Sequence, residues 1–222
     1  MTTTTKNVLH IKSSILGEHS VSSQLSAELL AAMQVEGSNL HIVERDFDIQ
    51  PVPHFDSAWL GAVSTPEDQR TAEQREKADF TDSLVAEVMD ADIIVMGLPM
   101  YNFSVPSMLK AWVDHIARAG VTFKYTEQGP EGLLGGKKAY LVASLGGDHD
   151  TDGADFLRPY MKLIMGFVGI TDVEIISAGG LNINPERKEQ AVAKARQTIA
   201  DISKKLKQAL KLESKLEISE AA

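Results

Sequence analysis

The sequence predicts an α/β protein with a doubly wound, five-stranded parallel sheet and helices on both faces. Short β-prone segments and amphipathic helical stripes alternate five times along the chain, as expected of parallel strands joined by crossover helices. Two strand segments, residues 92–97 and 138–144, are almost wholly apolar, which is typical of strands covered on both faces. No linker, repeat or low-complexity block divides the chain, so we expect a single domain over residues 1–222.

The first half of the chain begins with a β-prone run at residues 7–11. Apolar side chains then recur at four- and three-residue spacing from Val21 to Ala32, the stripe of an amphipathic helix. Residues 40–43 form a second strand, and the proline-containing connection at residues 51–55 is too interrupted for regular structure. A hydroxyl residue followed by proline and two acids, from Thr65 onward, predicts the start of the next helix.

The second half continues the same alternation and ends in a helix. Its predicted elements are strand 92–97, helix 108–116 with Gly120 as its stop, a small ribbon at 121–126, strand 138–144, helix 155–167, strand 172–177 and a closing helix with an apolar stripe from Val192 to Leu206. In such sheets ligands bind beyond the carboxyl ends of the strands, so we expect the functional residues in the loops there.

Composition and charge exclude several classes of function. The chain has no cysteine, which rules out disulfides, thiolate metal sites and a cysteine nucleophile. Residues 1–184 hold 13 Lys and Arg against 25 Asp and Glu, a balance that argues against nucleic-acid binding. Residues 185–222 have a net positive charge, but their basic and acidic residues alternate, as they do on a solvated helix face. Because no apolar run approaches the ~20 residues of a membrane span, and no signal core precedes the first strand, we expect a cytoplasmic protein.

The loop after the first strand carries four serines and ends at a helix N-terminus. Free backbone N–H groups and the helix dipole favour an anion there, and hydroxyl groups can donate hydrogen bonds to it. The loop lacks both the GxxxxGK[ST] and the GxGxxG pattern, so a single terminal phosphate fits better than a pyrophosphate. For any one serine, such as Ser20 or Ser22, a simple capping role is the alternative.

Two further loops at the same edge are candidate ligand sites. Tyr101 and Phe103 lie between two prolines after the third strand; this segment forms either a stiff shelf for a flat ring or a packed β–α turn. Gly146 and Gly147, after the fourth strand, allow close backbone approach to a ligand or simply make a tight turn. His149 is either a proton donor or a solvated loop residue.

These loops, taken with other segments, resemble the FMN-dependent NADH azoreductase family, whose members are also NADH:quinone reductases. The resemblance extends from the first strand to about Asp201, and PMYNF together with RAGVTFKYT is its most specific part. The matching segments are residues 12–16, 99–103, 117–126 and 129–133, Ser144 with Gly146 and Gly147, and residues 166–172.

The resemblance implies a flavodoxin-like fold with strand order 2-1-3-4-5, acting as a homodimer with FMN at the dimer edge. By position, Ser14, Ser20, Val21 and Ser22 would hold the FMN phosphate. Met100, Tyr101, Asn102 and Phe103 would line the isoalloxazine ring, and Ser144, Leu145, Gly146 and Gly147 its other side. Tyr125 and Phe167 of the partner subunit would close the substrate pocket.

Two departures from the family pattern limit this transfer. Leu145 stands where some relatives carry an arginine, so a charge contact from that position is lost. Residues 203–222 run past the family pattern, and we expect them to form a C-terminal helical extension without an assigned function.

The implied activity is reduction of quinones and aromatic azo compounds by NADH or NADPH. A hydride would pass from the nicotinamide to flavin N5 and then to the acceptor in ping-pong fashion, with no catalytic side chain and no metal. The sequence does not indicate which nicotinamide is preferred. The alternatives are a flavodoxin-type electron carrier without its own NADH turnover and a flavin-free interaction module of the same fold.

Overall fold

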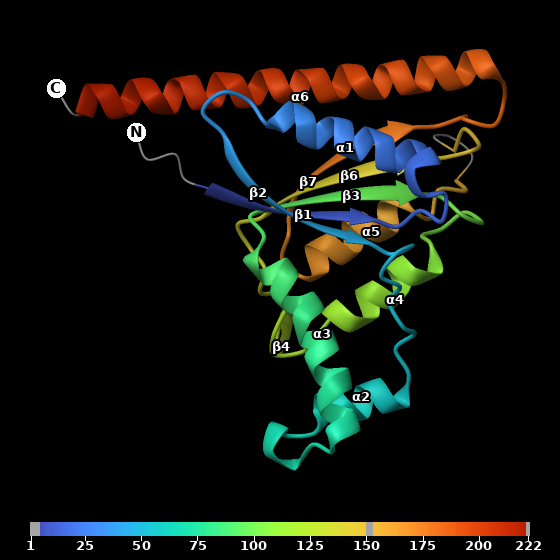
Figure 1. Ribbon diagram of the computed structural model, residues 1–222, viewed down its shortest axis with the longest axis vertical. Coiled ribbons are helices and arrows are strands. Elements are labelled where there is room, and N and C mark those ends of the chain that lie inside the picture. The colour runs from blue at the N-terminus through green and yellow to red at the C-terminus, as the bar shows by residue number, and fades with distance from the viewer. Residues whose placement is uncertain (1–4, 150–152, 221–222) are drawn as a thin grey trace.

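The computed structural model describes residues 5–149 and 153–220, with side chains as far as Leu212. Its centre is a five-stranded sheet with strand order β2-β1-β3-β6-β7, in which all neighbouring strands are parallel (Figure 1). The strands are β1 (Thr5–Lys12), β2 (Asn39–Asp46), β3 (Ile93–Pro99), β6 (Lys138–Ser144) and β7 (Asp172–Ala178). Because the remaining strands form a separate hairpin, this is the 2-1-3-4-5 order, and the expected fold class is confirmed.

Helices cover both faces of the sheet, and each face has its own hydrophobic core (Figure 1). On one face, α1 (Val21–Met33) and α6 (Pro185–Glu220) pack through Leu25, Leu29 and Ile199. On the other face lie α3 (Ala72–Asp90), α4 (Ser107–Ile116) and α5 (Arg158–Phe167), whose core includes Leu84 and Trp112. The near-continuous apolar strands follow from this double cover.

The segment after β2 differs from the sequence expectation. An unpredicted helix, α2 (Ser57–Ser64), follows the proline-containing connection. It is capped by Asp56, which accepts from the N–H groups of Ala58 and Trp59. Thr65 does not begin the next helix, because its hydroxyl donates to the Gly61 carbonyl at 2.7 Å and closes α2.

Helix α3 instead begins after Thr71, beyond a short 3-10 turn at Glu67–Gln69. The Thr71 hydroxyl accepts from the Gln74 N–H at 3.2 Å, and the Gln74 side chain accepts from the Thr71 N–H at 3.0 Å. This capping box satisfies two helix-end donors at once, which the Thr65–Pro66 start does not.

Two other helix boundaries also differ from those expected from the sequence. Helix α5 begins at Arg158 and not at Asp155, whose carboxylate accepts from the N–H groups of Leu157 and Arg158 just before the helix. Helix α4 ends at Ile116, so Gly120, with φ of 80°, lies in the turn that follows.

The predicted ribbon is one half of an antiparallel hairpin, β4 (Phe123–Thr126) with β5 (Gly129–Gly132). The hairpin is fixed to the body where Gly132 meets the turn between α5 and β7. A Cβ on Gly132 would lie 2.0 Å from the Gly169 nitrogen, so only glycine fits there. Next to this contact the Leu134 N–H donates to the Val168 carbonyl at 2.8 Å.

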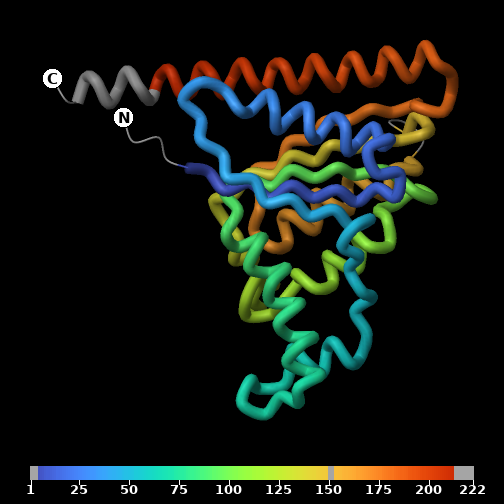
Figure 2. Tube along the Cα trace, viewed as in Figure 1, coloured from blue at the N-terminus to red at the C-terminus, as the bar shows by residue number. Residues whose placement is uncertain are grey.

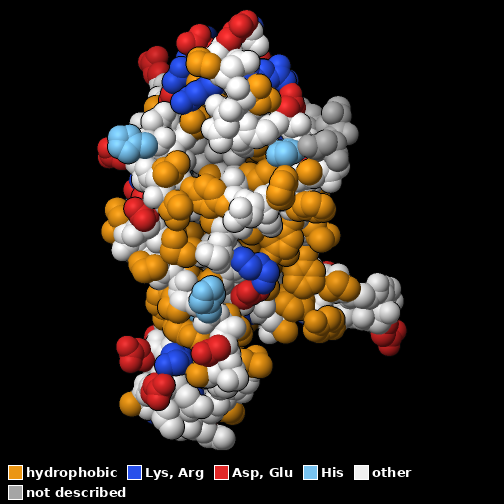
Figure 3. All heavy atoms as spheres, turned by 90° about the vertical axis from the view of Figure 1, so that its right-hand side faces the viewer, with side chains coloured by type: hydrophobic (Ala, Val, Ile, Leu, Met, Phe, Trp, Pro, Cys, Tyr) orange, Lys and Arg blue, Asp and Glu red, His pale blue; other side chains and the backbone are white. Residues whose placement is uncertain are grey.

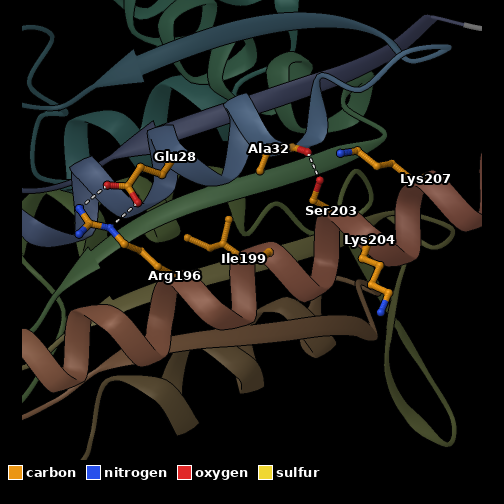
Figure 4. A pocket seen from close by; sticks show the side chains of 8 residues that line it. Glu28, Ala32, Arg196, Ile199, Ser203, Lys204 and Lys207 are labelled. Carbon is orange, nitrogen blue, oxygen red and sulfur yellow. Dashed lines mark hydrogen bonds and ion pairs between the residues drawn. The ribbon is translucent and has the colours of Figure 1, made fainter.

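Helix α6 is a single helix of 36 residues that crosses the whole sheet along its α1 face (Figure 2). Arg196 pairs with Glu28 of α1, and the Ser203 hydroxyl donates to the Ala32 carbonyl at 2.7 Å, on either side of a shallow groove of about 560 Å³ (Figure 4). The expected extension at 203–222 is the last part of this helix as far as Glu220, and residues 221 and 222 lie outside the described residues. Among the described helices, none is long and apolar enough to cross a membrane.

Candidate functional site

Three loops meet at the carboxyl edge of the sheet, which is the right-hand side of the molecule in Figure 1. They follow β1, β3 and β6, the strands at the centre of the sheet. The same side of the molecule carries a broad area of hydrophobic side chains (Figure 3). On the loops themselves Ile15, Leu16 and Phe103 are each more than half exposed. The edge thus combines apolar surface with the polar loop backbone.

The first loop carries buried hydroxyl groups and ends at the N-terminus of α1. Ser14, Ser20 and Ser22 are at most 2% exposed, although the loop itself lies at the surface. Ser20 is the N-cap of α1 and accepts from the Ser23 N–H at 3.4 Å, while its hydroxyl lies 3.0 Å from that of Ser22. Val21 is the first residue of the helix. Capping and anion binding are therefore compatible, since both use the same helix end.

The second loop is a tight hairpin turn in an unusual backbone conformation. Tyr101 and Ser104 exchange two backbone hydrogen bonds of 3.0 and 3.1 Å, and the two residues between them have positive φ, 49° for Asn102 and 70° for Phe103. Positive φ at both central positions is what a type I′ turn requires. The N–H groups of Asn102 and Phe103 have no partner among the described residues, and Phe103 is 52% exposed.

The third loop is fastened to the segment after β7. The carbonyls of Gly146 and Gly147 accept from the N–H groups of Asn182 and Gly180 at 2.9 and 2.8 Å. Their own N–H groups have no partner among the described residues. Leu145 differs from the other predicted site residues because its side chain is buried in the core and both its backbone groups are bonded within the protein.

Direct contacts tie the three loops into one site. The Ser14 hydroxyl lies 2.9 Å from the Tyr101 hydroxyl, which joins the first loop to the second. The Met100 N–H donates to the Ser144 carbonyl at 2.8 Å, and the rings of Phe103 and His149 meet edge to face at 5.6 Å. The structure therefore brings together the predicted residues of all three loops.

Tyr125 and Phe167 do not join this site within one subunit. Both pack against Phe123, with ring centroids 5.4 and 4.5 Å from it, at the base of the β4–β5 hairpin. The hairpin lies below the sheet in Figure 1, away from the loop edge. Tyr125 is 75% exposed, so its ring is available to a second molecule.

The segment that supports the third loop is not among the residues predicted from the sequence. Gly180, Asn182 and Arg187 follow β7, and the Arg187 guanidinium forms an ion pair with Asp148. The available signal was the Gly179–Gly180 pair directly after the last strand, with an asparagine two residues later. Such a glycine pair indicates that the loop after the last strand also lies at this edge of the sheet.

Comparison with known proteins places the chain in a family. Residues 6–202 match the family described as flavodoxin-like fold. The chain is 45% identical over 198 residues to a protein of Herminiimonas arsenicoxydans named FMN-dependent NADH:quinone oxidoreductase, covering 88% of this chain and 97% of the relative. A protein of Saccharophagus degradans with the same name is 47% identical over 203 residues, covering 88% and 92%.

A solved structure agrees with these relatives. The crystal structure of an azoreductase from Bacillus anthracis strain Sterne has a TM-score of 0.80 with this chain at 27% identity, covering 90% of this chain and 99% of the other. The strand order of this chain is that of a flavodoxin-like fold, and the relatives are covered over almost their whole length. The chain therefore belongs to the family of flavodoxin-like fold, in the group that includes the FMN-dependent NADH:quinone oxidoreductases.

Proposed function

We propose that the chain binds FMN at the three-loop edge and acts as an NAD(P)H oxidoreductase that reduces quinones and aromatic azo compounds. The observation that carries this proposal is the convergence of three loops. They offer buried hydroxyls on one side and, on the other, backbone N–H groups that have no partner within residues 5–149 and 153–220. The names of the relatives, an NADH:quinone oxidoreductase and an azoreductase, support the same activity.

The first loop suits the FMN phosphate. Ser20 and Ser22 lie at the N-terminus of α1, where the helix dipole favours an anion, and Ser14 offers a further buried hydroxyl in the same loop. No lysine or arginine lies between residues 13 and 44, so hydroxyl and amide groups would have to hold the phosphate. This agrees with the acidic composition of the chain, which provides few cations for the purpose.

The second and third loops suit the flavin ring. Among the residues that the structure describes, none accepts from the N–H groups of Asn102 and Phe103 or from those of Gly146 and Gly147. A flat ring with polar atoms at its edge can satisfy such groups while its face rests on apolar side chains. Ser144 stays at this edge, whereas Leu145 would support the site from the core without touching the ring.

When bound, FMN supplies the capacity to take a hydride from a nicotinamide and pass two electrons to an acceptor. The protein residues would hold and orient the ring, and the loop hydrophobics around Phe103 would exclude water from it. No side chain acts as a nucleophile in this scheme.

The proposal includes a homodimer that functions in the cytoplasm. The exposed Tyr125 and its neighbour Phe167, which lie away from the loop edge of their own subunit, would close the site of the second subunit. The single-domain organisation expected from the sequence is part of this proposal.

The test is steady-state oxidation of NADH and NADPH by the purified protein with FMN, using menadione as the quinone and methyl red as the azo dye. We expect yellow protein with absorbance near ~450 nm from the cofactor itself, and rapid turnover with menadione. Bound FMN without turnover would identify an electron carrier, and absence of FMN after reconstitution would leave only the interaction module. The Asn102→Asp variant, which sets a charge beside the ring, is expected to bind FMN more weakly; unchanged binding would remove Asn102 from the site.

A further inference from the structure

The glycine turn, defined as residues 145–148, is held from one side by the segment after β7. Three backbone hydrogen bonds join the two segments: from Leu181 to Leu145 at 3.1 Å, from Asn182 to Gly146 at 2.9 Å and from Gly180 to Gly147 at 2.8 Å. The Asn182 side chain also lies so close to Gly146 that a Cβ there would be 2.6 Å from it. The glycine turn therefore cannot shift unless the segment after β7 shifts with it.

Arg187, in the first turns of α6, joins this segment to the far end of the glycine turn. Its guanidinium pairs with the Asp148 carboxylate, one residue beyond Gly147. Its side-chain stem rests on Gly180, where a Cβ would lie 2.9 Å from the Arg187 Cγ. Its backbone N–H donates to the Asn184 side chain at 2.7 Å. The position of the guanidinium is thus fixed by contacts of the Arg187 backbone, of its side-chain stem and of the guanidinium itself.

The charges of this pair matter more to the site than to the stability of the fold. The Arg187 and Asp148 side chains are 46% and 39% exposed, and ion pairs this exposed contribute at most about 1 kcal/mol to folding. Asp148, however, adjoins the turn whose N–H groups would hold the ring. A carboxylate left without its partner there would oppose the added electron density of a reduced flavin.

We propose that Arg187 is a positioning residue for the flavin, which fixes the glycine turn and compensates the charge of Asp148. The inference rests on the proposed function, since it assigns Arg187 a role toward FMN at that same site. It gives α6 a direct connection to the cofactor loop, although the rest of the helix packs against α1 and β7 (Figure 1).

The test measures FMN affinity by quenching of flavin fluorescence and the midpoint potential of the bound flavin. We expect Arg187→Gln to weaken FMN binding on the order of tenfold, as for coupled neighbours, and to make the potential more negative. Arg187→Lys should restore part of both. The double variant Arg187→Gln with Asp148→Asn should return the potential toward the wild-type value, because no uncompensated carboxylate remains.

Arg196→Gln is the matched control, since it removes another exposed arginine–carboxylate pair from the same helix, with Glu28 of α1 as the partner instead of a residue of the glycine turn (Figure 4). It should leave both quantities unchanged. The inference is overturned if Arg187→Gln keeps the wild-type affinity and potential, or if Arg196→Gln changes them equally. A wild-type protein that binds no FMN would instead overturn the proposed function.

Discussion

Phe103 is the residue whose backbone departs furthest from what its side chain favours. A non-glycine residue with φ of 70° is uncommon, and a bulky aromatic one is strained, by roughly 1–2 kcal/mol in the left-handed region. Neighbouring Asn102 tolerates this region better because its short polar side chain can bond locally. Such strain is concentrated at functional sites, where the surrounding structure enforces it. Here the two hydrogen bonds between Tyr101 and Ser104 enforce it.

Replacing Phe103 with glycine should separate stability from function. We expect Phe103→Gly to leave the free energy of unfolding unchanged or to raise it by up to about 1 kcal/mol, because glycine adopts positive φ without strain. The same change should lower FMN affinity and NADH turnover through loss of the apolar shelf. Urea unfolding and steady-state kinetics measure the two effects.

Phe156→Gly is the control for this change, since Phe156 is also an exposed loop phenylalanine but has no positive φ. It should be destabilised, as glycine raises the entropy of the unfolded chain. If Phe103→Gly loses more stability than Phe156→Gly, the strain at Phe103 is not the dominant effect.

Residue types and their order predicted most of the candidate site, but not its backbone geometry. The serines, the aromatic shelf and the glycine pair could be found because each follows a predicted strand at the same edge of the sheet. The left-handed turn at Phe103 could not be found, because its sequence lacks the glycine that normally marks a type I′ turn. Leu145 was assigned by position alone, and only the structure places its side chain in the core.

At the scale of elements, a close backbone contact helps to attach the β4–β5 hairpin to the body. Gly132 lies against Gly169 and Val168 with no space for a methyl group. The hairpin carries Tyr125, the residue proposed to reach the second subunit, so its position relative to the sheet determines where that ring lies. A rigid attachment is therefore needed for a site shared between subunits.

Gly132→Ala should detach the hairpin from the body. We expect a loss of about 1–3 kcal/mol in the free energy of unfolding, the usual cost of inserting a methyl group without space. The proposed dimer should also weaken, as measured by analytical ultracentrifugation. Gly61→Ala is the matched control: Gly61 lies in α2 with open space around it, and alanine should stabilise the helix by about 1 kcal/mol. Equal stability of the Gly132 variant and wild type would contradict the prediction.

Strands were predicted more accurately than helix starts. Apolar runs such as residues 92–97 indicate a buried strand directly, whereas several residues compete to cap a helix. Thr65 and Thr71 are both plausible caps, and the choice depends on Gln74, whose side chain completes the capping box at Thr71. Helix α2 was missed because it is only eight residues long and follows two prolines.

At the scale of the whole molecule, a buried histidine lies on each face of the sheet. His10 on β1 lies 2.8 Å from the Ser26 hydroxyl of α1, and His115 on α4 lies 2.9 Å from the Thr81 hydroxyl of α3. Burial lowers the pKa of both histidines below the ordinary value of 6.5. At His10 this outweighs the opposing effect of Glu44, and at His115 that of the Pro53 carbonyl.

These pKa directions determine how stability depends on pH. The unfolded chain binds protons at these histidines more readily than the folded one, so their contribution is fully present above pH 6.5 and is lost as pH falls from there toward the lowered folded-state pKa values. We expect the free energy of unfolding, from urea titrations, to fall between pH 7.5 and 5.5.

The double variant His10→Gln with His115→Gln provides the comparison. It should be less stable than wild type at pH 7.5, because buried hydrogen bonds are disturbed, yet it should lose less stability over the same pH interval. A slope equal to that of wild type would show that other groups cause the pH dependence.

The length and direction of α6 have a practical consequence for attaching the protein to a surface. The helix starts beside the glycine turn, and its red part reaches the side of the molecule opposite to the loop edge (Figure 2). A tether placed at the exposed Leu212 position would therefore orient every molecule with its loop edge outward. On an electrode, this orientation would leave the loop edge open to diffusing acceptors and keep it apart from the conducting surface by the length of the strands.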